Sequence, residues 1–280
     1  MPVLPTKKDL TVQIISEIQA ILTDFNTKNN LNLAVDTIRA TFHKNAYHKT
    51  HGNKLEHLKK YVKKYNMKFI KVAKFSSNYQ KLKQRLSSED LANAYILKNL
   101  TTKENERIYY INHTKENKDK ATLIIYGLKQ YHHEAPSKRL INDLMRVINN
   151  ISSLDLCFDR DKPYNIEAIK ENYTIYEPIK YHGNTIYINT LNLANILKIC
   201  LYNKTIKNNL DFECYRAEAT IDVPNLNAKN QSLNRYERLN ITLYQSLQEY
   251  GLFLNLATKE PTISYSDTYY KRQAILKDKI

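Results

Sequence analysis

Hydrophobic and polar positions follow two different periods along the chain. Between residues 9 and 25, apolar side chains recur every three or four positions, which is typical of an amphipathic helix. The short segment 35–42 and the lysine-rich segment 54–65 predict two more helices, separated by a polar loop around His48 and His51. The first part of the chain is therefore expected to be mainly helical.

Short apolar runs become frequent after about residue 106. One strand is expected earlier, at 68–75, and the later strands are predicted at 107–112, 121–126, 152–159, 184–189, 196–203 and 212–222. Helices are predicted at 137–149, 166–171 and 230–250. This order indicates an α+β fold, an antiparallel sheet backed by helices, preceded by a small basic all-α domain. The expected division is a helical domain at 1–75, a polar linker at 76–105 and the α+β domain at 106–280.

The charge of the chain points to a polyanionic partner. The net charge is +15, and residues 1–90 carry 17 Lys and Arg against 7 Asp and Glu. Glycine-rich phosphate loops are absent from the sequence, which argues against ATP hydrolysis. Three cysteines without a Cys-x-x-Cys pair argue against a disulfide framework or structural zinc, and favour a reducing cytoplasm. Neither a signal peptide nor a membrane span is expected.

The candidate chemistry lies on three of the predicted strands. Alternation places Asp155 and Asp159 on one face of the first strand. The second strand carries Tyr202 near its end, and the third places Arg216 and Glu218 on one face. Tyrosine suits a reversible nick in DNA, because its phenolate is both nucleophile and leaving group. Carboxylates can hold a divalent ion that polarises the phosphate oxygens.

In this order the three segments resemble the replication initiation factor family, which comprises initiators of rolling-circle plasmid replication and related relaxases of integrative elements. The resemblance implies that Tyr202 is the nucleophile that forms a 5′-phosphotyrosine, with Lys204 and Arg216 holding phosphates. It further implies that Mg²⁺ or Mn²⁺ is bound by a carboxylate set, Asp155, Asp159 and Glu218. Tyr187 and Tyr215 are rival nucleophiles, and Asn203 stands where the family usually has an acid.

The N-terminal segment 10–67 is similar to the later helices of a phage-repressor-type helix-turn-helix. That likeness places the short helix in the major groove. The side chains expected to contact DNA are Thr37, Arg39, His43, Lys44, Lys49 and Lys54. A basic helical hairpin that only touches phosphates is the alternative. The histidines at 43, 48, 51 and 57 fit no zinc finger without cysteines.

The function expected from the sequence is a DNA-binding rolling-circle initiator or relaxase of a plasmid or other mobile element. Its partners would be an origin duplex, the nicked single strand and a host helicase, and homodimerisation is left open. Two alternatives remain. One is a non-catalytic DNA-binding regulator of the same fold, which needs no metal. The other is an RNA-binding protein whose tyrosines stack on single-stranded bases.

Overall fold

The computed structural model describes residues 7–44, 53–85, 91–114, 118–131, 134–148, 150–176, 185–193, 195–223 and 235–259, without the side chains of 7–14, 81, 83–85 and 235–240. The helices are α1 (Lys7–Asn29), α2 (Lys54–Val62), the short 3-10 helix η2 (Lys63–Tyr65), α3 (Ser77–Arg85), α4 (Lys138–Ile148), α5 (Ile166–Lys170), α6 (Lys204–Asn208) and α7 (Arg235–Ala257). The strands are β1 (Ala34–His43), β2 (Met67–Lys71), β3 (Leu91–Asn99), β4 (Asn105–His113), β5 (Lys120–Tyr126), β6 (Ser153–Arg160), β7 (Ile175–Tyr176), β8 (Thr185–Ile188), β9 (Ile196–Asn203) and β10 (Tyr215–Asp222).

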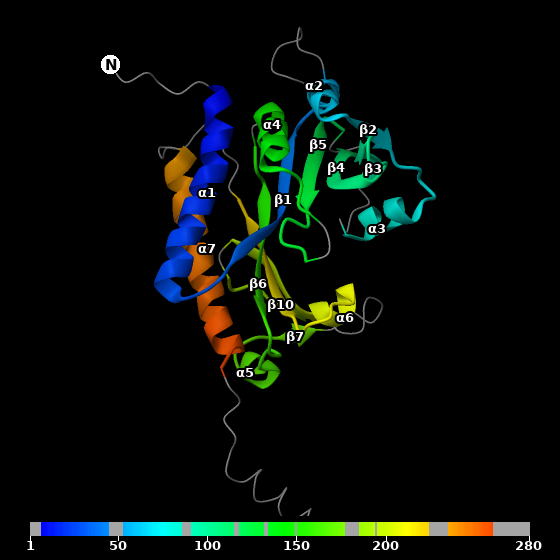
Figure 1. Cartoon of the computed structure of the whole chain (residues 1–280). Coiled ribbons are helices and arrows are strands. Elements are labelled where there is room, and N and C mark those ends of the chain that lie inside the picture. Colours follow the sequence, from blue (N-terminus) through cyan, green and yellow to red (C-terminus); the bar gives the residue numbers. More distant parts are fainter. Residues whose placement is uncertain are drawn as a thin grey trace, which may run out of the picture.

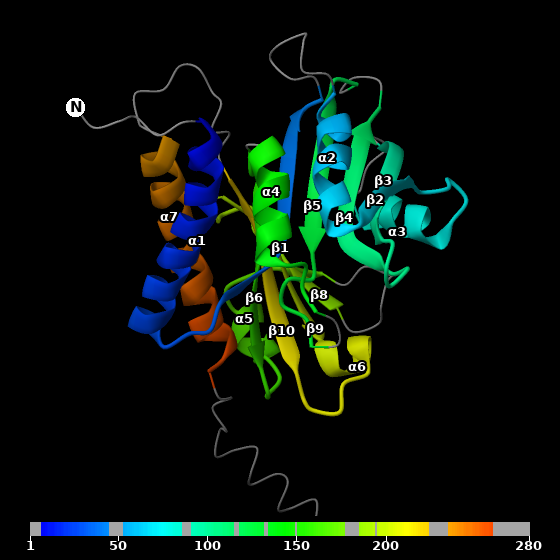
Figure 2. The ribbon, with the colours of Figure 1, turned by 45° about the horizontal axis from the view of Figure 1, so that its top comes forward.

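All these strands join one antiparallel sheet in the order β2-β3-β4-β5-β1-β6-β10-β9-β8-β7. The N-terminal strand β1 lies in the middle, between β5 and β6. Helices α1 and α7 run side by side against one part of the sheet, and α4 lies beside α1 (Figures 1 and 2). Helix α2 contacts α4 and covers the other end of the same face. The sheet is thus backed by helices along its length.

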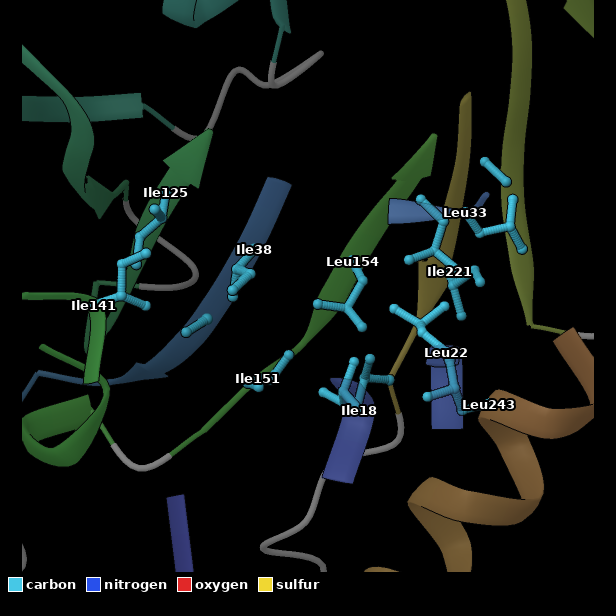
Figure 3. Close-up of a cluster of buried hydrophobic side chains, with 14 of the residues drawn as sticks. Ile18, Leu22, Leu33, Ile38, Ile125, Ile141, Ile151, Leu154, Ile221 and Leu243 are labelled. Atoms are coloured by element: carbon cyan, nitrogen blue, oxygen red, sulfur yellow. The ribbon is translucent and has the colours of Figure 1, made fainter. Parts of the chain in front are cut away.

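Strand registers show which face of the sheet is apolar. One continuous row across five strands consists of Ile108, Ile125, Ile38, Leu154 and Ile221. All five are buried in the main core. Figure 3 shows part of this row between Ile141 of α4 and residues of α1 and α7. Because side chains alternate along a strand, the neighbouring positions must point to the opposite face.

The opposite face of the sheet has two regions. Over β3, β4 and β5 it forms a second apolar cluster under α3, which includes Tyr79, Leu82, Ile96, Tyr109 and Ile124. Over β1, β6, β10 and β9 it carries charged and hydroxyl side chains instead. This second region is called the polar face below.

The helix predicted at 35–42 is wrong, because this segment is strand β1. Ile38, Ala40 and Phe42 alternate with polar residues, and Thr and Ile favour a pleated, half-buried surface.

 

The burial of Ile38, Ala40 and Phe42 on the helix-covered face decides between the two periods in favour of the strand. A helix-turn-helix is therefore not formed by the described residues.

The linker predicted at 76–105 contains α3 and β3, and β3 pairs with both β2 and β4. Strands β1 and β2 belong to the same sheet as the strands that follow residue 106. The described residues of 1–75 are thus not a separate all-helical unit. The predicted α+β fold with an antiparallel sheet backed by helices is confirmed. No described helix is long and apolar enough to span a membrane.

The main core gives a test of the fold. Leu144 of α4 is 0% exposed, whereas Leu197 of β9 is 59% exposed. We expect Leu144→Ala to lower the free energy of unfolding by about 2–5 kcal/mol, because it removes buried methyl groups and leaves a cavity. Leu197→Ala is the control and should change it by less than about 1 kcal/mol. Urea unfolding followed by circular dichroism measures both, and equal effects would contradict this packing.

Candidate active site

The polar face brings together side chains from four neighbouring strands. One row across β6, β10 and β9 contains Asp159, Arg216 and Tyr202. The next row on this face contains Cys157, Glu218 and Cys200, and a third contains Asp155, Thr220 and Lys198. The three sequence segments that suggested chemistry therefore lie on adjacent strands with their polar side chains on one face.

Arg216 is the most deeply buried charge of this face, with an exposure of 0%. Its Nε and Nη2 atoms donate to the two carboxylate oxygens of Asp159 at 2.6 and 2.7 Å. Nη1 donates to Asp36 at 2.9 Å, and Nη2 also donates to the backbone carbonyl of Lys129 at 2.8 Å. Arg216 was predicted to hold a phosphate, but these bonds point its guanidinium into the protein. Arg216 therefore holds Asp159, Asp36 and the Lys129 backbone in place.

A second ion pair lies further along β6. Arg39 of β1 donates two hydrogen bonds to Asp155, both at 2.6 Å, and Thr220 donates a third at 2.7 Å. Paired hydrogen bonds between a guanidinium and a carboxylate are among the strongest in proteins. This arrangement fixes β1, β6 and β10 relative to each other.

Tyr202 and Glu218 form the pair of side chains best suited to catalysis. The phenol of Tyr202 donates a hydrogen bond of 2.9 Å to Glu218. Burial raises the pKa of Tyr202, and the negative charge of Glu218 raises it further. Desolvation also raises the pKa of Glu218, and repulsion from Asp155 and Asp36 adds to the effect. A carboxylate of raised pKa beside a hydroxyl nucleophile is the arrangement of a general base and its substrate proton.

Two lysines of α6 approach this pair differently. Lys204 is buried, and its ammonium donates to the carbonyl of Lys129 at 3.0 Å. Burial lowers the pKa of Lys204, and the charge of Arg216 lowers it further. Lys207 is exposed, with its ammonium 3.7 Å from the ring centroid of Tyr202. Of the two, Lys207 is the lysine placed to meet a phosphate at Tyr202.

Asn203 explains how α6 begins at this point. Its side chain accepts a hydrogen bond from the backbone N–H of Ile206 and caps the helix. The chain leaves β9 at Asn203 and enters α6 at once, so that Lys204 and Lys207 lie close to the polar face. Asn203 therefore has a structural role of its own.

The predicted metal ligands do not assemble as a set. Asp155 and Asp159 are four residues apart on one strand, which separates them by about 13 Å. Both carboxylates are occupied by arginines, and Glu218 accepts from Tyr202. No group of three or more His, Cys, Asp or Glu side chains suited to a metal occurs within the described ranges. The three carboxylates therefore do not fit one ion.

The predicted DNA-contacting residues are dispersed by the strand conformation of β1. Thr37 is buried on the polar face, and Arg39 is bound to Asp155. His43 and Lys44 lie at the end of β1. Lys54 donates to the carbonyl of Ile148 and lies 4.9 Å from the ring centroid of Phe42, and Lys49 lies outside the described residues. The recognition helix that would have gathered them is absent from the described part of the chain.

Sequence reasoning missed four residues of this site. Asp36 and Lys129 bind Arg216, Tyr131 donates to Asp159 at 2.9 Å, and Lys207 covers Tyr202. Only Lys207 had a usable signal, because its spacing of three from Lys204 places both on one side of a helix. Asp36 was hidden by the wrong helix at 35–42. Lys129 and Tyr131 lie in the connection after β5, where no periodic pattern exists.

Comparisons with known proteins add little at the level of sequence. No protein-family model matches the chain, and no curated protein matches it either. Among solved structures, the chain is similar to the rolling circle replication initiator protein from Geobacillus stearothermophilus. The two sequences are 12% identical, the similarity covers 85% of this chain and 91% of that chain, and the TM-score is 0.41.

The Arg216–Asp159 pair makes acid stability a test of the site. Burial opposes ionisation of Asp159, but the hydrogen bonds and charge of Arg216 outweigh it and lower the pKa of Asp159 below 3.8. A lowered pKa stabilises the fold above the unfolded-state value and loses this contribution as the pH falls through the folded-state value.

We expect Asp159→Asn to lower the free energy of unfolding at pH 7 by about 3–5 kcal/mol, because one partner of a buried pair is removed. The loss relative to the unaltered protein should shrink as the pH falls below about 4. Urea unfolding at pH 7 and pH 3 measures this. Asp161→Asn, at an exposed position just after β6, is the control and should have little effect at either pH.

Proposed function

We propose that this protein binds DNA and nicks one strand through Tyr202, as in rolling-circle initiation or strand transfer by a relaxase. The observation that carries the proposal is the hydrogen bond of 2.9 Å from the Tyr202 phenol to Glu218, with the ammonium of Lys207 3.7 Å from the centroid of the same ring.

 That ammonium also attracts Glu218 electrostatically, so nucleophile, base and cation form one connected group.

The reaction that these residues support is a transesterification. The Glu218 carboxylate accepts the proton of the Tyr202 phenol, and the phenol oxygen attacks the phosphorus of one strand. The bond from phosphorus to the O3′ atom breaks, and O3′ leaves with the electron pair and takes a proton from solvent. The products are a 5′-phosphotyrosine and a free 3′-OH, and the retained ester bond allows later rejoining. Lys207 would stabilise the charge that develops on the phosphate.

The remaining charges of the polar face hold this pair in place. Arg216 lies directly opposite Tyr202 across β10 and β9, and its own bonds fix its position. Thr220 and Arg39 hold Asp155 one row beyond Glu218. The net charge of +15 supports a nucleic acid as the partner. An origin duplex and the nicked strand are the partners we propose, with a host helicase to unwind the DNA.

The direct test is covalent trapping. We expect Tyr202→Phe to abolish the protein–DNA adduct formed on labelled single-stranded or supercoiled DNA, because the attacking oxygen is removed. Denaturing gels measure the adduct, in EDTA and in Mn²⁺, so that a metal requirement is read from the same experiment. Tyr187→Phe and Tyr215→Phe are the controls and should retain adduct formation. An undiminished adduct in Tyr202→Phe would rule out Tyr202 as the nucleophile.

A second experiment tests the base. Glutamine at position 218 can still accept a hydrogen bond but takes no proton, so Glu218→Gln should slow adduct formation by about 10²–10⁴-fold. Because the pKa of Glu218 is raised above 4.5, the rate should increase with pH along a limb whose midpoint lies above that value. This limb should be lost in Glu218→Gln. Thermal unfolding should show no loss of stability at neutral pH, since burying an ionised Glu218 disfavours folding.

One observation favours a second function, which is DNA binding without cleavage. Tyr202 is only 8% exposed, and its raised pKa makes the phenol a weak nucleophile until it is deprotonated. A regulator of this fold would bind DNA with a strong dependence on salt and form no adduct. The adduct assay separates the two functions.

A further inference from the structure

The outer edge of the sheet at β2 carries a dense group of lysines. Between residues 54 and 74 the chain has eight lysines and one acidic residue. Strand β2 is the first in the sheet order, so its outer side pairs with no other described strand. The lysine edge is defined here as six residues on α2, η2, β2, β3 and the connection after β2: Lys59, Lys63, Lys68, Lys71, Lys74 and Lys98.

These lysines surround the edge strand from both sides. Lys59 and Lys63 are four residues apart along α2 and η2, and the ammonium of Lys59 lies 5.8 Å from the ring centroid of Tyr95 on β3. Lys71 is the direct cross-strand neighbour of the same tyrosine. On the other face of the edge, Lys68 lies directly opposite Lys98. Like charges directly opposite each other destabilise a sheet, so this pair favours an anion between or beside them.

Few of these charges are neutralised within the protein. Glu56 binds Lys59 at 2.7 Å. The other five lysines of the edge form no ion pair with another described residue. By contrast, Lys64 of η2, which follows Lys63 in the chain, binds Asp143 of α4. The lysine edge therefore carries five positive charges that no described acidic residue pairs.

An apolar ring lies within this group of charges. Phe75 follows Lys74 in the connection between β2 and α3, and it is 99% exposed. Figures 1 and 2 show this connection at the outer margin of the molecule, beyond β2 and α3. An aromatic side chain exposed to this extent loses the favourable burial that its size offers. Next to Lys74 in the chain, it is placed to pack against a sugar or base of a nucleic acid whose phosphates the lysines bind.

We propose that the lysine edge binds the phosphate backbone of duplex DNA and that Phe75 packs against the same DNA. The partner rests on the proposed function, in which the substrate is DNA. A duplex fits better than a single strand, because single-strand binding needs several accessible rings for stacking. Here Tyr95 contacts Lys59 and Tyr110, and Tyr65 donates a hydrogen bond of 2.5 Å to Asp143. Tyr61 of α2 is 38% exposed, but its ring lies 5.5 Å from the ammonium of Lys64, which leaves Phe75 as the most exposed ring near the edge among the described residues.

The strand order sets the length of DNA that this surface requires. Seven strand-to-strand steps separate β2 from β9, which carries Tyr202. At about 4.8 Å per step the separation is about 34 Å, or about ten base pairs of B-DNA. A duplex that adjoins the cut strand should therefore reach the lysine edge only when it is about ten base pairs long or longer.

Binding to two DNA probes tests the proposal. Both probes carry the same single-stranded segment, joined to a duplex of either 5 or 20 base pairs. The lysine edge predicts tighter binding of the longer probe, by fluorescence anisotropy. In a variant with Lys63, Lys68, Lys71, Lys74 and Lys98 changed to Gln, this advantage should disappear. The slope of log K against log salt on the longer probe should become less steep by about 4.5.

A control variant carries the same loss of charge elsewhere: Lys28, Lys138, Lys162, Lys170 and Lys259 changed to Gln. It should keep the advantage of the longer duplex. Phe75→Ala should weaken binding of the longer probe about tenfold without changing the salt slope, because an apolar contact releases no counterions. Equal losses in both lysine variants, or tighter binding of an RNA duplex of the same length, would overturn the proposal.

The same variants separate this proposal from the nicking reaction. If the edge binds DNA as proposed, the Lys-to-Gln variant should still form the covalent adduct on single-stranded DNA, where the edge is not used. If no protein forms an adduct but the probe and salt effects are present, the nicking proposal fails and the lysine edge stands. If adducts form and neither effect is present, the lysine edge fails and nicking stands.

Discussion

The buried guanidinium of Arg216 is the interaction on which the rest of the polar face depends. Taking a charge out of water costs several kcal/mol unless other groups replace its hydration. Asp159 of β6, Asp36 of β1 and the carbonyl of Lys129 after β5 supply these groups. A register slip of one residue in β10 would turn Arg216 into the apolar core, so the ion pairs and the core select the same pairing. The geometry of the site follows from that selection.

The balance of charge on this face explains why Glu218 differs from its neighbours. Asp155 is paired with Arg39, and Asp159 shares Arg216 with Asp36. Glu218 has a tyrosine as its hydrogen-bond partner and lies between these carboxylates. Its pKa is raised, whereas that of Asp159 is lowered. Carboxylates within one site thus receive different properties from their partners, which is how proteins assign a proton-accepting role to one of them.

The sequence predicted the α+β class, the strands of the site and the face that Asp155 and Asp159 share, because alternation over eight residues is a local signal. It failed for β1, where a short segment fits both periods. The polar residues of β1 are explained only by distant partners: Arg39 binds a residue 116 positions away, and Asp36 binds one 180 positions away. No pattern within β1 contains that information. The same limit applies to the predicted metal ligands, since residue types alone do not show that arginines already occupy two of them.

Charge along the chain was also an incomplete guide to the proposed DNA-binding surface. The basic first third is real, yet Lys54 binds the carbonyl of Ile148, and Lys64 binds Asp143. Tertiary contacts decide which lysines can bind an external anion. Among the described residues, five lysines at the β2 edge form no ion pair. Because β2 and β9 belong to one continuous sheet, DNA held at the edge would lie at a set distance from Tyr202. One sheet would then carry both the proposed duplex binding and the proposed strand cleavage.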